Sequence, residues 1–279
     1  MLSSCGQTAG GSGSESGNDS DELQDVSEDE EPVSKADILL SQMTLREKIG
    51  QMLFIQPESL RIETEDGQVK ADTSSVTEFT EAMAKTLEEY PPGGIIIFGG
   101  NIESPDQLKE LVNDIKADSR IPLFMGIDEE GGMVARIANS PGFNVKKFES
   151  MQKIGSTKDP KNAEEAGKVI GEYLRDYGFN LDFAPVADVN TNPENIVIGS
   201  RAFGDDPQLV AEMVSAGIRG LHSSKVMSCI KHFPGHGDTK DDTHAGFVSI
   251  DKNWEELEAC ELIPFKAGIE AKTDMIMIS

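Results

Sequence analysis

Six short apolar segments alternate with helix-like segments along this chain, and this alternation limits its possible folds more than any other feature. The apolar segments are residues 50–55, 93–98, 122–127, 179–185, 226–233 and 275–278. Most of them are continuously apolar rather than alternating, which is typical of strands buried on both faces of a parallel sheet. Strands that alternate with helices in this way predict an α/β fold.

The helix-like segments carry recognisable start and stop signals. Helix starts are predicted at the capping boxes of residues 44–47 (TLRE) and 104–107 (SPDQ), and at the Asp-Pro pairs of residues 159–160 and 206–207. Gly178 is expected to close the helix that begins at Pro160. A last helix is expected from about Asn253 to Ala271.

Polar and glycine-rich residues cluster just after the strand-like segments, where an α/β barrel places its active-site loops. A doubly wound sheet is the competing architecture, but the sequence lacks the early glycine-rich phosphate turn usual in such folds. We therefore expect a TIM-type (β/α)8 barrel of which about six of the eight units are present. Because the chain ends at Ser279, within or just after a strand-like segment, we expect the C-terminal part of the barrel to be missing.

The N-terminal segment differs in composition from the rest. Residues 7–34 are dominated by Gly, Ser, Asp and Glu, and such a segment cannot bury enough surface to offset its ordering entropy. Residues 2–6 (LSSCG) resemble the end of a bacterial lipoprotein signal peptide, although no apolar region precedes them. We expect residues 1–35 to comprise an N-terminus that is lipidated at Cys5, followed by a disordered acidic linker. Residues 36–279 are expected to form the folded domain, a partial barrel. A chance cysteine on a cytosolic chain and an acidic interaction tail are the alternatives.

The net charge of -25 argues against nucleic-acid binding and against docking onto anionic lipid through basic residues. The odd cysteine count and wide spacing predict neither a disulfide framework nor a CxxC metal site. Cys229 and Cys260 are expected to be small core residues. No apolar run reaches about 18 residues, so membrane attachment is expected only through a lipid at Cys5.

The densest polar segment is residues 231–246 (KHFPGHGDTKDDTHAG), which begins at the end of a strand-like segment. Asp242 precedes His244 by two residues, so its carboxylate can hydrogen-bond one imidazole nitrogen and raise the pKa of the imidazolium. His244 is therefore a candidate general acid/base. A local contact within a solvated loop is the alternative.

A metal site is the rival interpretation of the same segment. His232, His236, His244 and Asp238 are possible ligands, but their spacing matches neither a helix-borne HExxH pattern nor a zinc finger. We expect no metal and no cofactor.

Two more polar side chains follow other strand-like segments. Asp128, within IDEEGG (127–132), can accept hydrogen bonds from adjacent sugar hydroxyls, or can cap a helix. Arg201, within GSRAFG (199–204), supplies several fixed donors, or can form a surface ion pair with Asp205 or Asp206.

Four segments together resemble glycoside hydrolase family 3 and, within it, the bacterial β-N-acetylglucosaminidase branch: residues 127–132, 180–204, 231–244 and 274–279. The resemblance extends from about residue 37 to the end of the chain. It implies the α/β barrel. It also implies that Asp128, Arg201, Lys231 and His232 bind the sugar, and that Asp242 and His244 form the acid/base dyad of a D-[ST]-H signature.

The reaction implied by the resemblance is retaining hydrolysis of terminal β-linked N-acetylglucosamine, from peptidoglycan fragments or chitooligosaccharides, through a glycosyl-enzyme. The family's nucleophile is an aspartate at the tip of the next strand, and no aspartate of this chain matches that motif. We therefore expect this chain alone not to turn over substrate. A phosphorylase or a non-catalytic sugar-binding lipoprotein is the alternative. A monomer on the extracytoplasmic side of the membrane is expected.

Overall fold

The structure, a computed structural model, describes residues 34–65, 68–71, 74–239 and 252–279. The chain divides into two compact units, Met1–Gln42 and Met43–Ser279. In the first unit the structure describes helix α1 (Lys35–Gln42), at whose start the backbone N–H of Asp37 donates to the Ser34 hydroxyl. Cys5 and the acidic linker lie outside the described residues. The expected boundary near residue 35 therefore stays a prediction.

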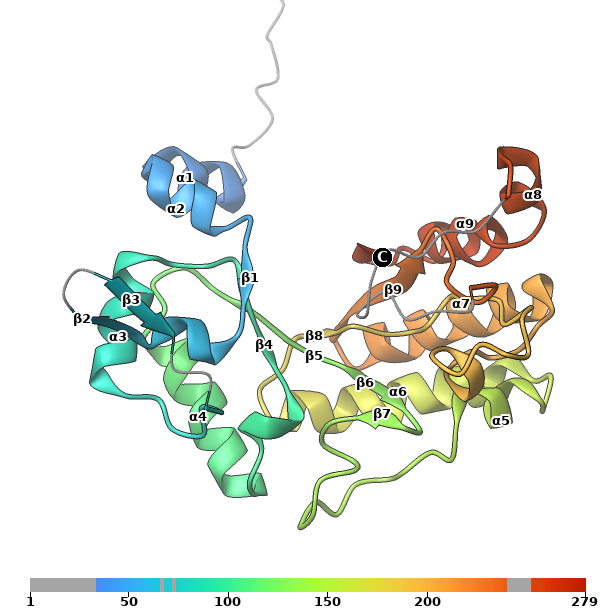
Figure 1. The fold of residues 1–279 in the computed structure, drawn as a ribbon, viewed down its shortest axis with the longest axis horizontal. Coiled ribbons are helices and arrows are strands. Elements are labelled where there is room, and N and C mark those ends of the chain that lie inside the picture. Colours follow the sequence, from blue (N-terminus) through green and yellow to red (C-terminus); the bar gives the residue numbers. More distant parts are fainter. Residues whose placement is uncertain (1–33, 66–67, 72–73, 240–251) are drawn as a thin grey trace, which may run out of the picture. The chain divides into compact units, whose positions relative to one another are not determined.

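The second unit is built on a parallel sheet of six strands in the order β1-β4-β5-β8-β9-β10 (Figure 1). The strands are β1 (Phe54–Ile55), β4 (Gly94–Ile97), β5 (Phe124–Ile127), β8 (Leu181–Asp182), β9 (Met227–Phe233) and β10 (Met275–Ile278). Each strand pairs in parallel with the one that precedes it in the sheet. A sheet that follows the order of the chain is characteristic of a barrel, whereas a doubly wound sheet reverses its order. The expected six-stranded part of an α/β barrel is confirmed.

The main helices connect consecutive strands. They are α3 (Glu81–Glu89), α4 (Pro105–Ala117), α6 (Pro160–Asp176), α7 (Pro207–Ser223) and α9 (Leu262–Glu270). Helix α7 packs between α6 and α9 (Figure 1). None of the helices in the described part of the chain is long and apolar enough to cross a membrane.

The predicted helix starts are confirmed. Capping boxes are formed at Thr44, before α2 (Leu45–Gly50), and at Ser104, before α4. Asp159 and Asp206 cap α6 and α7 through their side chains. Gly178 lies just beyond α6 with a φ of 90°, a conformation that glycine adopts without steric cost.

The expected single helix from Asn253 to Ala271 is wrong. The structure has two helices there, α8 (Trp254–Ala259) and α9, because Cys260 leaves the helical conformation with φ -138° and ψ -79°. Pro264 is the third residue of α9. Proline is tolerated in the first turn of a helix and disrupts an interior, so a new helix start just before Pro264 accommodates it.

Several short elements were not predicted. They are η1 (Pro57–Leu60), the hairpin β2 (Ile62–Glu65) and β3 (Gln68–Ala71), η2 (Gly99–Asn101), the hairpin β6 (Glu129–Gly131) and β7 (Val134–Ala135), α5 (Met151–Gly155) and η3 (Gly199–Arg201). The expected first strand, residues 50–55, is also shorter than predicted, because Gly50 ends helix α2 and only Phe54 and Ile55 join the sheet.

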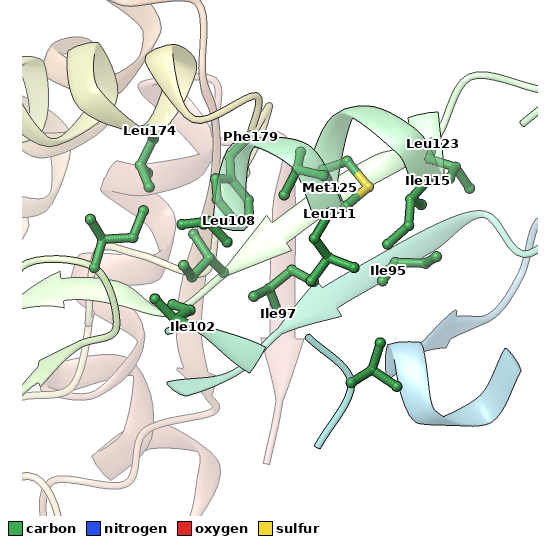
Figure 2. Close-up of a cluster of buried hydrophobic side chains, with 14 of the residues drawn as sticks. Ile95, Ile97, Ile102, Leu108, Leu111, Ile115, Leu123, Met125, Leu174 and Phe179 are labelled. Atoms are coloured by element: carbon green, nitrogen blue, oxygen red, sulfur yellow. The ribbon is translucent and has the colours of Figure 1, made fainter. Parts of the chain in front are cut away.

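The apolar core lies between the sheet and its helices. Side chains of β4 and β5 meet the inward face of α4, and Figure 2 shows Ile95, Ile97, Met125, Leu108 and Leu111 packed together. All five are buried, and burial of apolar surface is the main favourable contribution to folding. Cys229 is buried as expected, and burial raises the pKa of its thiol to about 12. Cys260 is half-buried against a second core cluster.

Candidate functional site

A cavity of about 600 Å³ lies where β4, β5 and β9 end. Barrel enzymes place their active sites at this end of the sheet. Its ionisable lining residues are Asp128, Glu130, Arg136, Arg201, Lys231, His232 and His236. The ionisable lining residues therefore come from segments that lie up to about a hundred residues apart in the chain, between Asp128 and His236.

Lys231 occupies the centre of this group. Its Nζ lies 2.7 Å from Oδ1 of Asp128 and 2.6 Å from Oε1 of Glu130. Burial alone would lower the pKa of Lys231, but the two carboxylates outweigh it and the pKa is raised. Lys231 is therefore a fixed cation that can donate to a ligand and cannot serve as a base near neutral pH.

Arg201 holds Glu130 from the other side. Its Nε and Nη2 donate to the two Glu130 oxygens at 2.8 and 2.7 Å, and its Nη1 donates to the carbonyl of Val197. Burial alone would raise the pKa of Glu130, but the charge of Lys231 and the bonds from Arg201 outweigh it and the pKa is lowered. The carboxylate partner of Arg201 among the described residues is thus Glu130 rather than Asp205 or Asp206.

His232 is held by a buried carboxylate. The ring Nδ1 of His232 lies 2.6 Å from Oδ2 of Asp188. The backbone N–H groups of His232 and His236 both donate to Oδ1 of Asp188. Nη2 of Arg201 lies 3.3 Å from Nε2 of His232. Because arginine only donates, Nε2 accepts this bond and Nδ1 carries the proton given to Asp188. The ring is therefore fixed in one tautomer and one orientation.

Two further acidic side chains, those of Glu129 and Asp182, are buried and are not part of the cavity lining. The Glu129 carboxylate accepts hydrogen bonds from the backbone N–H groups of Ile137 and Ala138 and from the Tyr173 hydroxyl, at 2.8, 2.9 and 2.8 Å. Burial raises the pKa of Glu129 in spite of these bonds. Asp182 is fully closed to solvent and accepts the Glu129 backbone N–H at 3.0 Å. Burial raises its pKa well above the ordinary value, so the carboxyl is protonated over a wider pH range than a surface aspartate.

The structure brings Asp128, Arg201, Lys231 and His232 together around one cavity. Their assignment to sugar binding stays a prediction. Asp242 and His244, the expected acid/base dyad, lie outside the described residues.

Glu130, Asp188 and Arg136 were not among the expected site residues. A signal for Glu130 was present in the sequence, because residues two apart on an extended segment face the same side and Glu130 follows Asp128 by two. Asp188 and Arg136 lie in loops, where no such periodicity applies.

Of the residues of the rival metal site, His244 lies outside the described residues and the other three bind other protein groups, His232 through Asp188. Nδ1 of His236 bonds the Thr239 hydroxyl at 2.7 Å, and Asp238 pairs with Lys252 at 2.9 Å. Among the described residues, no group of three or more His, Cys, Asp or Glu side chains is arranged to hold a metal ion.

The family model described as the glycosyl hydrolase family 3 N terminal domain matches residues 44–279. This chain belongs to glycoside hydrolase family 3. The family expected from the sequence motifs is thereby confirmed.

Two curated relatives are bacterial β-hexosaminidases. The chain is 34% identical over 206 residues to β-hexosaminidase A of Pseudoalteromonas piscicida, a match that covers 71% of the chain and 34% of the relative. It is 35% identical over 209 residues to the β-hexosaminidase of Xanthomonas euvesicatoria pv. vesicatoria (strain 85-10), covering 73% of the chain and 61% of the relative. The chain thus spans between about a third and three fifths of the length of these relatives.

Solved structures of family 3 share the fold. A β-N-acetylglucosaminidase from Paenibacillus sp. str. FPU-7 matches with a TM-score of 0.74 and 32% identity, over 85% of this chain and 42% of that one. NagZ from Neisseria gonorrhoeae, in complex with N-trifluoroacetyl-D-glucosamine, matches with a TM-score of 0.70 and 28% identity, over 81% and 62%. These likenesses confirm the barrel architecture.

Proposed function

We propose that the protein to which this chain belongs hydrolyses terminal β-linked N-acetylglucosamine residues, with peptidoglycan fragments or chitooligosaccharides as substrates. The observation that supports this most is the single hydrogen-bonded network of Asp128, Glu130, Lys231, Arg201 and His232 around the cavity. The relatives support the same proposal, because the curated ones are β-hexosaminidases and one solved structure holds an N-acylated glucosamine.

The network suits an uncharged polar ligand. Lys231 and Arg201 are neutralised by Asp128 and Glu130, so a sugar can enter without leaving a buried charge unpaired. Lys231 and Arg201 retain N–H donors for ring hydroxyls, and Asp128 retains a carboxylate oxygen as an acceptor. In this proposal the three side chains orient the sugar ring, and His232 fixes the guanidinium of Arg201.

The proposed chemistry is retaining. His244, oriented by Asp242, protonates the departing glycosidic oxygen and then takes a proton from the water that cleaves the glycosyl-enzyme. The attacking carboxylate belongs to the family motif that no aspartate of this chain matches, so we assign this role to no residue here. A phosphorylase would differ only in the second step, in which phosphate replaces water.

Attachment to the membrane through a lipid on Cys5, on the extracytoplasmic side, is part of the proposal, as is a monomeric state. Both can be tested in cells and in solution. The protein should move from the membrane fraction to the soluble fraction when Cys5→Ser is introduced, and light scattering should give the mass of one chain.

The first test of the function is binding. Isothermal titration of the complete gene product with N-acetylglucosamine should show saturable binding that is tighter than binding of glucose. Loss of binding in Lys231→Met, with none lost in the exposed Lys266→Met, would support the site; equal affinity for both sugars would reject the assignment to N-acetylglucosaminides.

The second test is product analysis with the complete gene product. Chitobiose should release free N-acetylglucosamine whether or not phosphate is present, and His244→Ala should abolish release while leaving N-acetylglucosamine binding intact. Formation of N-acetylglucosamine 1-phosphate in phosphate buffer would instead identify a phosphorylase. Binding without any cleavage would identify a sugar-binding protein.

A further inference from the structure

Lys252 joins two carboxylates that come from different parts of the chain. Its Nζ lies 2.9 Å from Oδ2 of Asp238, and it also pairs with Oε1 of Glu261. Asp238 follows β9 in the sequence, and Glu261 lies at the start of α9. Burial alone would lower the pKa of Lys252, but the two carboxylates outweigh it and the pKa is raised. Lys252 is therefore charged near neutral pH and links the two segments through ion pairs.

Glu261 makes one end of this link rigid. Its side chain is closed to solvent and packs against the loop after β9, where a Cβ at Gly235 would lie 2.7 Å from its Cβ and Cγ. Among the described residues, Lys252 is the only cation that pairs with Glu261, and Oε2 of Glu261 has no hydrogen-bond partner there. A buried carboxylate that loses its cation is strongly destabilised. The position of Lys252 is therefore tied to that of Glu261.

Asp238, at the other end of the link, is held by the loop after β8. The Thr191 hydroxyl donates to Oδ1 of Asp238 at 2.8 Å. The side-chain amide of Asn192 donates to the carbonyl of Thr239 at 3.1 Å. The chain is thus fixed by hydrogen bonds as far as Thr239, and Asp238 offers Lys252 a partner with little freedom of its own.

The position of this link in the sequence gives it a consequence for catalysis. Asp238 precedes residues 240–251 and Lys252 directly follows them. These residues lie outside the described part of the chain and include His244, to which the proposed chemistry assigns the proton transfer. Holding the two ends of a segment together lowers the entropy that is lost when the segment is ordered. A misplacement of about 1 Å can slow a reaction on the order of 100-fold, so a contact outside the cavity can control the rate.

We propose that Lys252 is a positioning residue for the acid/base step, because it joins Asp238 to Glu261 and so holds together the two ends of the segment that contains His244. This inference rests on the proposed function, because it requires His244 to transfer a proton. Lys252 does not line the cavity. Its loss should therefore impair protonation of the leaving group and leave sugar binding unchanged.

The experiment measures kcat/KM of the complete gene product with two substrates whose leaving groups differ in their need for a proton. The sugar oxygen that departs from chitobiose takes the bonding electron pair and must be protonated. The phenolate that departs from 2,4-dinitrophenyl β-N-acetylglucosaminide keeps that pair as a stable anion and needs no acid.

Lys252→Met should lower kcat/KM for chitobiose about 10-fold or more, and for the dinitrophenyl glycoside less than about 3-fold, since only the first requires a well-placed acid. The affinity for N-acetylglucosamine, measured by isothermal titration, should stay the same. Lys252→Arg keeps the positive charge and should recover most of the loss. Lys266→Met is the control, because Lys266 pairs with Glu258 at an exposed position, and it should match the unmodified protein with both substrates.

The outcomes separate this inference from the function on which it rests. Equal losses for the two substrates in Lys252→Met, or an unchanged kcat/KM for chitobiose, would overturn the role of Lys252 while leaving the proposed function intact. No cleavage of either substrate by the unmodified protein would overturn the proposed function and the inference together. If Lys252→Met does not fold, Asp238→Asn replaces it, because Glu261 then keeps its cation. The loss should again be confined to chitobiose, and equal losses would overturn the inference.

Discussion

Nζ of Lys231 lies 2.6 Å from Oε1 of Glu130, and both side chains are closed to solvent, with exposed fractions of 3% and 1%. The two residues come from different strands, β6 and β9, and both line the cavity. Glu130 also carries the guanidinium of Arg201, so one carboxylate joins two cations. A buried pair of this kind is a poor source of net stability, but removing one partner leaves the other charge buried and unpaired.

Glu130→Gln should therefore be strongly destabilising. The amide removes the charge that compensates Lys231 and Arg201, and the free energy of unfolding should fall by about 3–5 kcal/mol. Urea unfolding followed by circular dichroism measures this change. Glu258→Gln, which removes an exposed pair with Lys266, should cost less than about 1 kcal/mol. Equal costs for the two variants would show that the buried pair is not isolated from water.

Asp182 makes stability depend on pH. Burial raises its pKa in the folded state above the unfolded value of about 3.9. As pH rises from about 4, the unfolded chain releases this proton before the folded chain does, so the free energy of unfolding falls until the folded-state pKa is reached.

Asp182→Asn removes the contribution of Asp182 to the pH dependence of the free energy of unfolding, and the side-chain amide oxygen still accepts the Glu129 backbone N–H. The variant should be more stable relative to the unmodified chain at pH 7.5 than at pH 5, because only the unmodified chain loses stability as the pH rises above the unfolded-state pKa of Asp182. Urea unfolding at both pH values measures the difference. Asp205→Asn, at an exposed position, is the control. A stability difference for Asp182→Asn that does not change with pH would contradict a protonated carboxyl.

Asp188 should control the orientation of His232. Its two oxygens accept N–H groups of His232 and His236, and Asp188→Asn places an amide NH₂ against at least one of these donors. We expect a loss of about 1–3 kcal/mol in the free energy of unfolding and weaker N-acetylglucosamine binding.

The Nδ1–H proton of His232 gives the sharper measurement of this change. Its NMR signal should shift or disappear in Asp188→Asn and persist in Asp206→Asn, where asparagine caps α7 as well as aspartate does. An unchanged signal in Asp188→Asn would show that another group holds the ring.

Helices α6 and α7 touch through a glycine. A Cβ at Gly220 would lie 2.2 Å from the carbonyl oxygen of Glu164, so Gly220→Ala must push the helices apart. We expect a loss of about 1–3 kcal/mol in the free energy of unfolding, although alanine is the better helix former. At Gly217 on the same helix, a Cβ meets the Pro185 ring at 3.6 Å, an ordinary contact. Gly217→Ala should therefore gain up to about 1 kcal/mol, and the same sign in both variants would refute the close contact.

The sequence by itself determined the class of fold and the family. Apolar runs such as residues 93–98 and 122–127 predicted buried parallel strands, and Ser104 and Asp159 marked helix starts that the structure has at those places. These features depend on neighbouring residues, so they can be read from a local pattern. The motifs likewise placed Asp128 and Lys231 at strand ends, because a strand and the residues that follow it are continuous in the chain.

Only the tertiary structure decided which side chains meet. Lys231 pairs with carboxylates about a hundred residues earlier, His232 is held by Asp188, and Arg136 is left with unused donors. The split between α8 and α9 at Cys260 was missed, although Pro264, which would disrupt the interior of a single long helix, was a local signal of it. Pairing of this kind depends on strand register and on the paths of loops. Both are set by packing of the whole barrel rather than by any local run of residues.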